Sequence, residues 1–476
     1  MPSTATLIPN PWMILPFGLL LAAIALGPLW FSGWWGRNYA RVAFGLGAVT
    51  LLYYLAGLKA WSRVGHTATE YLSFIVLIGA LFVVSGGIHI TVKGEATPRA
   101  NCAFLLIGAL LANLLGTTGA SMLLIRPWLR LNAYRATAHH VVFFILIVAN
   151  VGGCLSPIGD PPLFLGYLKG IPFFWVVRHC WPMWAVGVGT LLVMFYFIDR
   201  RNYLRAPAAV RAELAEPADE WRFSGLANLG FLALILAAVF VQKPPLVREL
   251  IMVLAATASY LTTKPEIHEA NHFNFHPIRE VAILFVGIFA TMMPALDWLE
   301  THAGNFGAPK VALYYWGSGT LSSVLDNAPT YLSFLSAALG ALVPPDVVDQ
   351  VSAIVRQPGA GGAIAAHLPL PVLQTMAALH ECFPAALASG TATREQIGIA
   401  CLLGNPALNP FIVAISVGSV FFGANTYIGN GPNFMVKAIA DQKRVHAPDF
   451  IAYVLKFTLP FMLPMLVLVW WLFFRG

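Results

Sequence analysis

The sequence predicts an all-α polytopic membrane protein, built as two inverted structural repeats of about five spans each. Three observations support this fold class. The 476 residues are 58% hydrophobic and only 10% charged, which excludes a soluble globular protein. About ten apolar segments are long enough to cross a bilayer. Two interrupted apolar segments, one in each half of the chain, also share a short sequence pattern.

The apolar segments define the predicted spans. Several of them are too long or too interrupted to be simple transmembrane helices. No basic residue precedes Arg37, so the first segment lacks the charged start of a cleavable signal peptide, and we expect it to stay in the mature chain. The predicted spans lie near residues 12–32, 39–59, 68–92, 137–163, 173–198, 224–241, 247–263, 280–298, 396–433 and 450–474.

The net charge of +7 comes from basic residues between spans, which indicates a cytoplasmic bias rather than a nucleic-acid partner. The main basic clusters share one side if the N-terminus lies outside and residues 98–130 enter the membrane and return. Lys59, Arg63, Lys243 and Arg248 are exceptions. We therefore expect the N-terminus outside. The absence of a targeting peptide fits a multi-pass protein of a bacterial inner membrane. The clusters are Arg37 and Arg41; Lys93 and Arg99; Arg126, Arg130 and Arg135; Arg200, Arg201, Arg205 and Arg211; and Lys437, Lys443 and Arg444.

Residues 199–222, rich in Arg, Ala, Pro and Glu, are predicted to form a cytoplasmic linker between the two halves. With five crossings in residues 1–198, the second half, residues 223–476, starts on the opposite side of the membrane. Two halves in opposite orientation are typical of inverted-repeat transporters. An insertion at 343–368, with a Pro/Gly/Ala run, lengthens the second half.

Each half contains a predicted broken helix, at residues 137–167 and 396–441. The stretch G-C-L-S-P-I-G-D-P-P at 153–162 and the stretch G-A-N-T-Y-I-G-N-G-P at 423–432 both read G-x-x-x-x-I-G-[DN]-x-P. Prolines stop a helix because they lack a backbone N–H and clash with the preceding turn. Backbone groups freed in this way persist in a membrane only where protein or a water-filled cavity meets them.

A second polar interruption precedes each broken helix. In the first half it lies at 116–121, and in the second at 322–330. The apolar arms on either side have roughly 8 to 15 residues, too few to span a bilayer at about 1.5 Å per residue. We therefore predict re-entrant hairpins at 98–130 and 309–342. Two hairpin tips and two broken helices would enclose a small polar chamber for an ion or small solute.

Asp160 and Asp326 are the only acids at the four interruptions. A carboxylate at mid-membrane costs about 2.5–3.5 kcal/mol on insertion scales, so such acids are functional candidates by default. One interpretation is a Na⁺ or proton site, and the other is capping of a turn or helix. Neutral oxygens suited to a cation come from Asn150, Ser156, Asn327, Thr330, Asn425, Thr426, Asn430 and Asn433.

Thr117 and Thr118 suit either a cation or a carboxylate substrate. No arginine falls at any interruption, which weakens an anion-binding interpretation without excluding it, because backbone amides and bound Na⁺ also hold anions. His139 and His140 begin a predicted span at the basic side, where we expect them at the interface. His380 and Glu381 form either a scaffold ion pair or a proton relay.

Several chemistries are excluded by missing patterns. The chain has no Walker-type G-x-x-x-x-G-K-[ST], no H-E-x-x-H and no G-x-S-x-G, so neither ATP-driven transport nor an enzyme is expected. Five cysteines, an odd number without C-x-x-C, argue against disulfides and zinc. No cofactor is predicted beyond a coupling ion, Na⁺ and/or H⁺.

A resemblance to known transporters lies in two of these stretches. A-N-V-G-G-C-L-S-P-I-G-D-P-P at 149–162 resembles the broken-helix signature of NhaD-type sodium/proton antiporters, and L-S-S-V-L-D-N-A-P at 321–329 resembles their second-half hairpin. The wider group, the ion transporter superfamily, includes arsenite permeases, dicarboxylate carriers and citrate transporters, and the chain is similar to the CitMHS-like branch. One departure is that Thr118 and Gly119 stand where the second hairpin has its Asp-Asn pair.

The resemblance implies a homodimeric elevator, in which a transport domain of hairpins and broken helices carries substrate past a scaffold. It implies a secondary sodium (cation)/proton antiporter as the main expectation. The alternative is a sodium- or proton-coupled citrate or dicarboxylate transporter. The expected partners are thus a small inorganic cation or a carboxylate, the lipid bilayer and a second copy of the chain.

Overall fold

The structure, a computed structural model, describes residues 9–91, 96–205, 222–241, 244–302, 310–356 and 368–475. Within these ranges all regular secondary structure is helical except for one antiparallel pair of strands, β1 (His89–Thr91) and β2 (Arg222–Ser224), which confirms the all-α class. Eight of the described helices are long and apolar enough to cross a membrane, or up to ten if each of two sharply bent pairs is one span.

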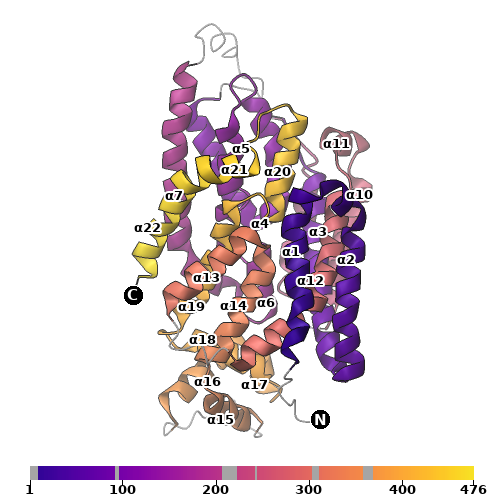
Figure 1. Cartoon of the computed structure of the whole chain (residues 1–476), viewed down its shortest axis with the longest axis vertical. Helices are drawn as coiled ribbons and strands as arrows, with labels where there is room; N and C mark the ends of the chain where they lie inside the picture. The colour runs from indigo at the N-terminus through magenta and orange to yellow at the C-terminus, as the bar shows by residue number, and fades with distance from the viewer. Residues whose placement is uncertain are drawn as a thin grey trace.

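One bundle of helices combines both halves of the chain (Figure 1). Small residues allow close helix contacts here, because a Cβ at Gly287 would lie 2.9 Å from the Cβ of Ala43. Phe74 and Phe285 stack with ring centroids 4.7 Å apart. The bundle contains α1 (Leu15–Trp30), α2 (Ser32–Leu52), α3 (Trp61–Gly86), α9 (Asn228–Ala238), α10 (Val247–Thr262) and α12 (His276–His302), with the short segments η1 (Pro11–Ile14), η2 (Tyr53–Gly57) and α11 (Pro265–Ala270) at its ends.

Most of the remaining described helices, long and short, form a second group beside this bundle. Its members are α4 (Pro98–Leu131), α5 (Ala138–Ile147), α6 (Pro161–Leu168), α7 (Phe173–Arg205), α13 (Val311–Val324), α14 (Asn327–Leu342), α19 (Asn409–Phe422), α20 (Gly431–Gln442), α21 (Phe450–Tyr453), η6 (Val454–Met462) and α22 (Leu463–Phe473). Below them lie α15 (Pro345–Val355), α16 (Leu370–Cys382), α17 (Pro384–Ala388) and α18 (Arg394–Gly404), which share a small core of their own.

Three predicted segments differ from the structure. The predicted span at 224–241 contains only the 11-residue helix α9, and the span at 396–433 is divided between α18 and α19, which are bent by 100°. The predicted linker begins later than residue 199, because α7 continues to Arg205, and residues 206–221 lie outside the described ranges. The central part of the predicted insertion, residues 357–367, also lies outside them.

Helix α4 folds back on itself at Gly116, whose φ of 73° and ψ of 156° are not helical. A positive φ favours glycine, because it has no Cβ to clash with the backbone. The two arms lie side by side, since Asn101 Nδ2 donates to Asn132 Oδ1 at 2.8 Å. Helices α13 and α14 also fold back, and the rings of Tyr314 and Phe334 are 6.1 Å apart. Each half therefore has one folded-back pair of arms.

The two helix interruptions are built alike. In the first, between α5 and α6, the chain forms η3 (Val151–Leu155), and in the second, between α19 and α20, it forms η5 (Gly423–Asn425). The N–H of Gly159 donates to Ser156 Oγ at 3.1 Å, and the N–H of Gly429 donates to Thr426 Oγ at 3.1 Å. A hydroxyl thus replaces the missing helical acceptor at the same position of both patterns.

The hydroxyls of Ser156 and Thr426 also connect each interruption to a folded-back pair of arms by a hydrogen bond. Ser156 Oγ donates to the carbonyl of Asn113 in α4 at 2.7 Å. Thr426 Oγ donates to the carbonyl of Ser323 in α13 at 2.6 Å. Each interrupted helix is therefore joined to the folded-back arms of its own half of the chain.

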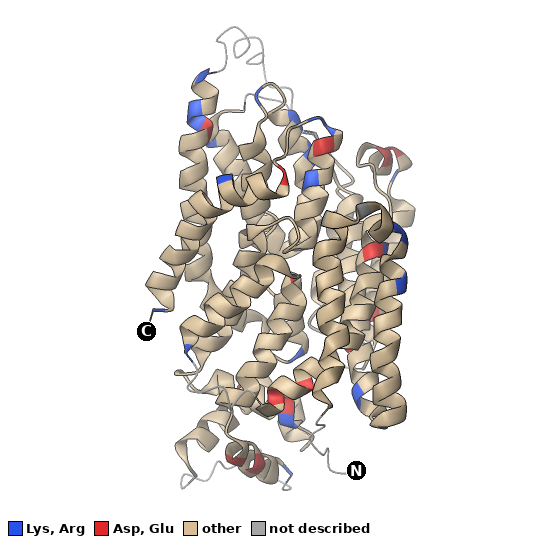
Figure 2. Cartoon of the chain, in the orientation of Figure 1, with Lys and Arg blue, Asp and Glu red and all other residues tan. Residues whose placement is uncertain are grey.

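Lys and Arg residues are concentrated at the upper end of the molecule, where α7 ends (Figure 2). Arg200, Arg201 and Arg205 lie in the last turns of α7, and Lys437 lies on α20. The first helical residues, in η1, lie at the opposite end. This asymmetry is the one expected when basic residues stay on the cytoplasmic side.

Candidate functional site

Asp160 lies where all four interruptions meet. Its side chain is buried, with 1% of the residue exposed, and it stands at the N-cap of α6. Thr117 Oγ, just after the kink in α4, donates to Asp160 Oδ1 at 2.6 Å. Asn430 Nδ2, at the N-cap of α20, donates to the same oxygen at 3.1 Å, and Asn327 Nδ2, the first residue of α14, donates to Oδ2. One carboxylate therefore joins both folded-back pairs and both interrupted helices.

The groups around Asp160 are also the beginnings of helices. The second arm of α4 starts at Thr117, α6 starts after Asp160, α14 starts at Asn327, and α20 starts after Asn430. Each helix start carries unpaired amides and a partial positive charge of about 0.5. Four such ends around one point favour negative charge there. These helix starts stabilise the negative charge of the Asp160 carboxylate, and no Lys or Arg is among the described residues bonded to it.

An amide network connects Asp160 to the middle of both interrupted helices. Asn430 Nδ2 also lies 3.2 Å from Asn150 Oδ1, and Asn150 Nδ2 donates to Asn433 Oδ1 at 2.6 Å. Asn433 Nδ2 in turn donates to the carbonyls of Gly423 and Thr426. Asn150 and Asn430, both predicted from sequence, are thus in direct contact.

Other predicted residues have partners other than Asp160. Asp326 Oδ1 accepts from the N–H of Ala328 at 3.0 Å, which is the helix-capping geometry, and Thr330 Oγ donates to the Asp326 carbonyl. Asn425 Nδ2 donates to Ser323 Oγ at 2.8 Å. Ser156 and Thr426 stabilise the turns described above. These residues support the backbone of the site, and none of their hydrogen bonds is to Asp160.

Two buried acceptors near the centre have no hydrogen-bond partner among the described residues. They are Oδ1 of Asn327 and Oδ1 of Asn425. Buried polar atoms without partners are rare in native proteins and often mark a missing ion or water. Because the amide of Asn327 also donates to Asp160, its free oxygen lies beside the carboxylate. A carboxylate with a neutral oxygen next to it is a donor set that suits a hard cation such as Na⁺.

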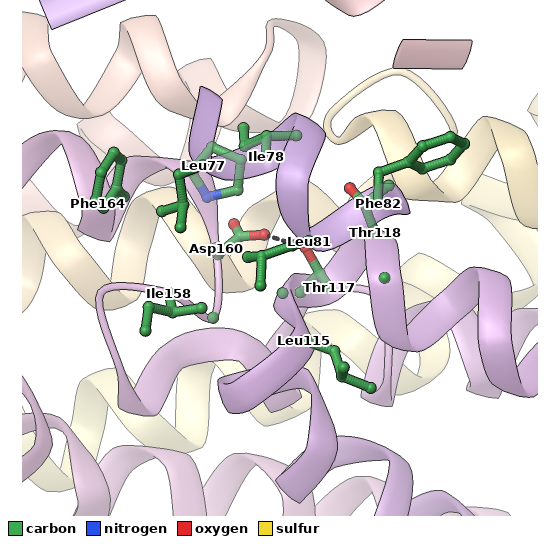
Figure 3. A pocket seen from close by; sticks show the side chains of 14 residues that line it. Leu77, Ile78, Leu81, Phe82, Leu115, Thr117, Thr118, Ile158, Asp160 and Phe164 are labelled. Atoms are coloured by element: carbon green, nitrogen blue, oxygen red, sulfur yellow. Dashed lines mark hydrogen bonds between the residues drawn. The ribbon is translucent and has the colours of Figure 1, made fainter. Parts of the chain in front are cut away.

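A small cavity of about 30 Å³ lies between this centre and α3. The tip of α4, with Thr117 and Thr118, forms one wall, and Ile158 to Pro161 form another. Figure 3 shows Asp160 and Thr117 joined by their hydrogen bond, with Leu77 and Leu81 of α3 beside them. Asp160 is the only charged residue of this lining. The volume suits a water molecule or a small cation.

Asn113 in α4 was not predicted from sequence, although it organises the first interruption. Its Oδ1 accepts from the N–H groups of Leu155 and Ser156, and its Nδ2 donates to the carbonyl of Gly152 at 2.7 Å. One side chain therefore replaces three backbone hydrogen bonds that the broken helix cannot make. Its signal in the sequence is weak, since it is a single amide in an otherwise apolar arm.

A second buried polar cluster surrounds Asp199 at the end of α7. His139 and His140 are 8% and 0% exposed, so both side chains are buried within the protein, and their position at the membrane interface stays a prediction. Their Nε2 atoms lie 3.3 Å and 3.0 Å from Asp199 Oδ1, and Arg135 donates to both carboxylate oxygens. Asp199 lies at the start of the predicted linker, where no buried partner was expected.

The Asp199 cluster has three groups close enough to share a metal ion, because their ligand atoms lie within 4.8 Å of one another. Arg135 already occupies both oxygens of the carboxylate. The N–H of Thr137 donates to His140 Nδ1 at 3.3 Å, so the proton of that ring belongs on Nε2, toward Asp199. The cluster is thus a buried ion pair with histidine donors.

Replacing Arg135 with Met is expected to destabilise the protein by about 3–5 kcal/mol, because it leaves the buried Asp199 carboxylate without its cation. Unfolding in detergent, followed by thermal melting, measures the effect. Lys437→Met is the control, since its pair with Asp441 is exposed and exposed pairs contribute roughly 1 kcal/mol or less. Equal melting temperatures for the two variants would contradict the assigned role of Arg135.

His380 and Glu381 are both exposed, at the end of α16. No ion pair between them is present among the described residues. The structure therefore gives no support to a buried relay at these positions.

The whole described site lies within a region that matches a known family model. The CitMHS_2 model, described as "Putative citrate transport", matches residues 6–474. No curated protein matches the chain. The match includes both folded-back pairs of arms, both interrupted helices and the connections between the two halves.

Proposed function

The chain belongs to the CitMHS_2 citrate-transport family, and from this membership we propose that it is a secondary transporter that moves citrate or a related small carboxylate together with Na⁺ or H⁺. Membership makes it a multi-pass membrane transporter and not an enzyme. Family membership does not specify the substrate, the coupling ion or the mechanism, and the proposals for these rest on the geometry of the site.

The convergence of four chain interruptions on Asp160 carries this proposal. A buried carboxylate in a membrane protein is costly, and here it is bonded to three other elements rather than to a fixed cation. Asp160 and the free Oδ1 of Asn327 are our proposed site for the coupling ion. The helix starts around them supply amides for the carboxylate groups of the substrate.

Transport by an elevator movement fits the division of the helices into two groups. We assign α4 to α7 and α13 to α22 to a moving transport domain, with α4 and α13–α14 as re-entrant hairpins. The bundle of α1 to α3 and α9 to α12 is assigned to the scaffold and to the dimer contact. The basic end of the molecule is assigned to the cytoplasm, which leaves the N-terminus outside.

Cation/proton antiport is the second candidate. It is favoured by the cavity beside Asp160, because a volume of about 30 Å³ suits a cation and its lining has no Lys or Arg. In that case Asp160 alone would be sufficient for Na⁺/H⁺ exchange, because its carboxylate would release a proton when it binds Na⁺.

The deciding experiment uses purified protein in proteoliposomes that contain a pH-sensitive dye. We expect labelled citrate to accumulate when an inward Na⁺ or H⁺ gradient is imposed, and empty liposomes serve as the control. Collapse of a pH gradient by NaCl or LiCl, without citrate uptake, would instead establish antiport. Protein that is folded and does neither would contradict both functions.

A further inference from the structure

Helix α6 connects the proposed coupling carboxylate to a buried ion cluster. Asp160 stands at its N-cap and Lys169 at its C-cap, and the eight residues between them span about 12 Å. The helix is confined sideways, because a Cβ at Gly166 would lie 2.3 Å from the Tyr331 hydroxyl on α14. Tyr167 also donates to the carbonyl of Val239 at 2.8 Å. A short, confined helix transmits a displacement at one end to the other.

Lys169 holds the far end of this helix against two others. Its Nζ lies 2.8 Å from Glu70 of α3 and 2.8 Å from Glu395 of α18. The side chains of Lys169 and Glu70 are each 9% exposed, and that of Glu395 is 34% exposed. Burial lowers the pKa of Lys169, but the nearby carboxylates Glu395 and Glu70 outweigh it and hold the pKa above its usual value. The side chain is therefore a charged ammonium.

The cluster has one ammonium for two carboxylates. The charge of Arg63 also acts on Glu70 and Glu395, but its hydrogen bonds go to Asp297 and Thr67. His66 lies 3.6 Å from Glu70, but its side chain is 55% exposed. Without Lys169, Glu70 and Glu395 would face each other as like charges, and α3 and α18 would no longer be joined through the end of α6.

We propose that Lys169 is a positioning residue for Asp160, and that its two ion pairs set the affinity of the site for the coupling ion. The pair with Glu395 fixes the end of α6 to α18 of the same helix group, and the pair with Glu70 holds it against the scaffold helix α3 in the arrangement described here. This inference rests on the proposed role of Asp160 in ion coupling. In this proposal the ion pairs of Lys169 with Glu70 and Glu395, which lie outside the site, control the ion affinity at Asp160.

The test compares Lys169→Met and Lys169→Arg with a matched control, Arg394→Met. Arg394 lies next to Glu395 but pairs with Asp349 at the exposed surface. We expect Lys169→Met to raise the Na⁺ or H⁺ concentration for half-maximal citrate uptake about tenfold, with Lys169→Arg close to wild type. Arg394→Met should leave this concentration unchanged. A purely structural role would lower the amount of folded protein and leave the half-saturating concentration at its wild-type value.

A second measurement does not depend on transport. Thr118, which lines the cavity and is half-buried, is replaced by cysteine, and its labelling by a membrane-impermeant thiol reagent is followed with and without Lys169→Met. We expect faster labelling when Lys169 is replaced, against the same chain without the introduced cysteine. Unchanged labelling of folded Lys169→Met protein would overturn the proposal. If citrate is not transported but labelling accelerates, the proposed substrate fails and the positioning role stands.

Discussion

Asp160→Asn is expected to lower ion-coupled citrate uptake roughly 100-fold, to near the level of empty liposomes. The change keeps the size and shape of the side chain but removes its charge. An amide replaces one of the two accepting oxygens with a donor, so it cannot accept from Thr117 and Asn430 on one side and from Asn327 on the other at once. The proposed coupling ion would lose Asp160, the one acidic residue in the cavity lining. Initial rates of labelled citrate uptake in proteoliposomes measure the loss.

Two further variants test whether the loss of uptake is specific to Asp160. Asp441→Asn, on the exposed face of α20, changes the same chemical group and should retain full uptake. Asp326→Asn is expected to retain most of it, because asparagine also caps helices and the Asp326 side chain accepts from Ala328. Abolished uptake in Asp326→Asn with normal uptake in Asp160→Asn would reverse the assignment of the two acids.

Gly159→Ala and Gly429→Ala are each expected to destabilise the protein by about 3 kcal/mol or more, and to abolish uptake. A Cβ at Gly159 would lie 2.1 Å from the carbonyl oxygen of Gly153, and a Cβ at Gly429 would lie 2.6 Å from that of Gly423. In both interruptions the obstacle is backbone, which does not move aside as a flexible side chain does. Thermal melting in detergent, together with citrate uptake, measures the effect.

Gly431→Ala is the matched control for this pair. It lies two residues after Gly429, at the start of α20, and nothing stands within 4 Å of its added Cβ. Its melting temperature and uptake should equal those of the wild type. Wild-type stability and uptake with alanine at position 159 or 429 would contradict this prediction, because the backbone would then move to accommodate the added Cβ.

The sequence was most informative where backbone chemistry alone determines the outcome. The prolines and glycines at 153–162 and 423–432 mark helix interruptions through their effect on hydrogen bonding, which requires no knowledge of neighbours. The glycine at 116 marks the kink of α4 for the same reason. Thr117, Asn327, Asn430 and Asp160 could be listed as candidates because they are polar residues at these points.

The sequence could not tell which candidates meet, because contact depends on how distant elements pack. Asp160 and Asp326 look equivalent in the chain, yet one accepts from three other elements and the other caps its own helix. Neither the role of Asn113 in the first helix interruption nor that of Asp199 in the buried ion pair could be predicted from the sequence, for the same reason. Each is a polar residue whose partners are brought to it only by the fold.

The two interrupted helices repeat the same frame, but only one copy has an acid. Asp160 corresponds to Asn430 in the shared pattern, and a 3.1 Å hydrogen bond joins them. Two carboxylates at these positions would repel each other at the point where the halves of the molecule meet. The acid in one interruption and the amide in the other therefore make the two matching turns complementary, where two acids would repel.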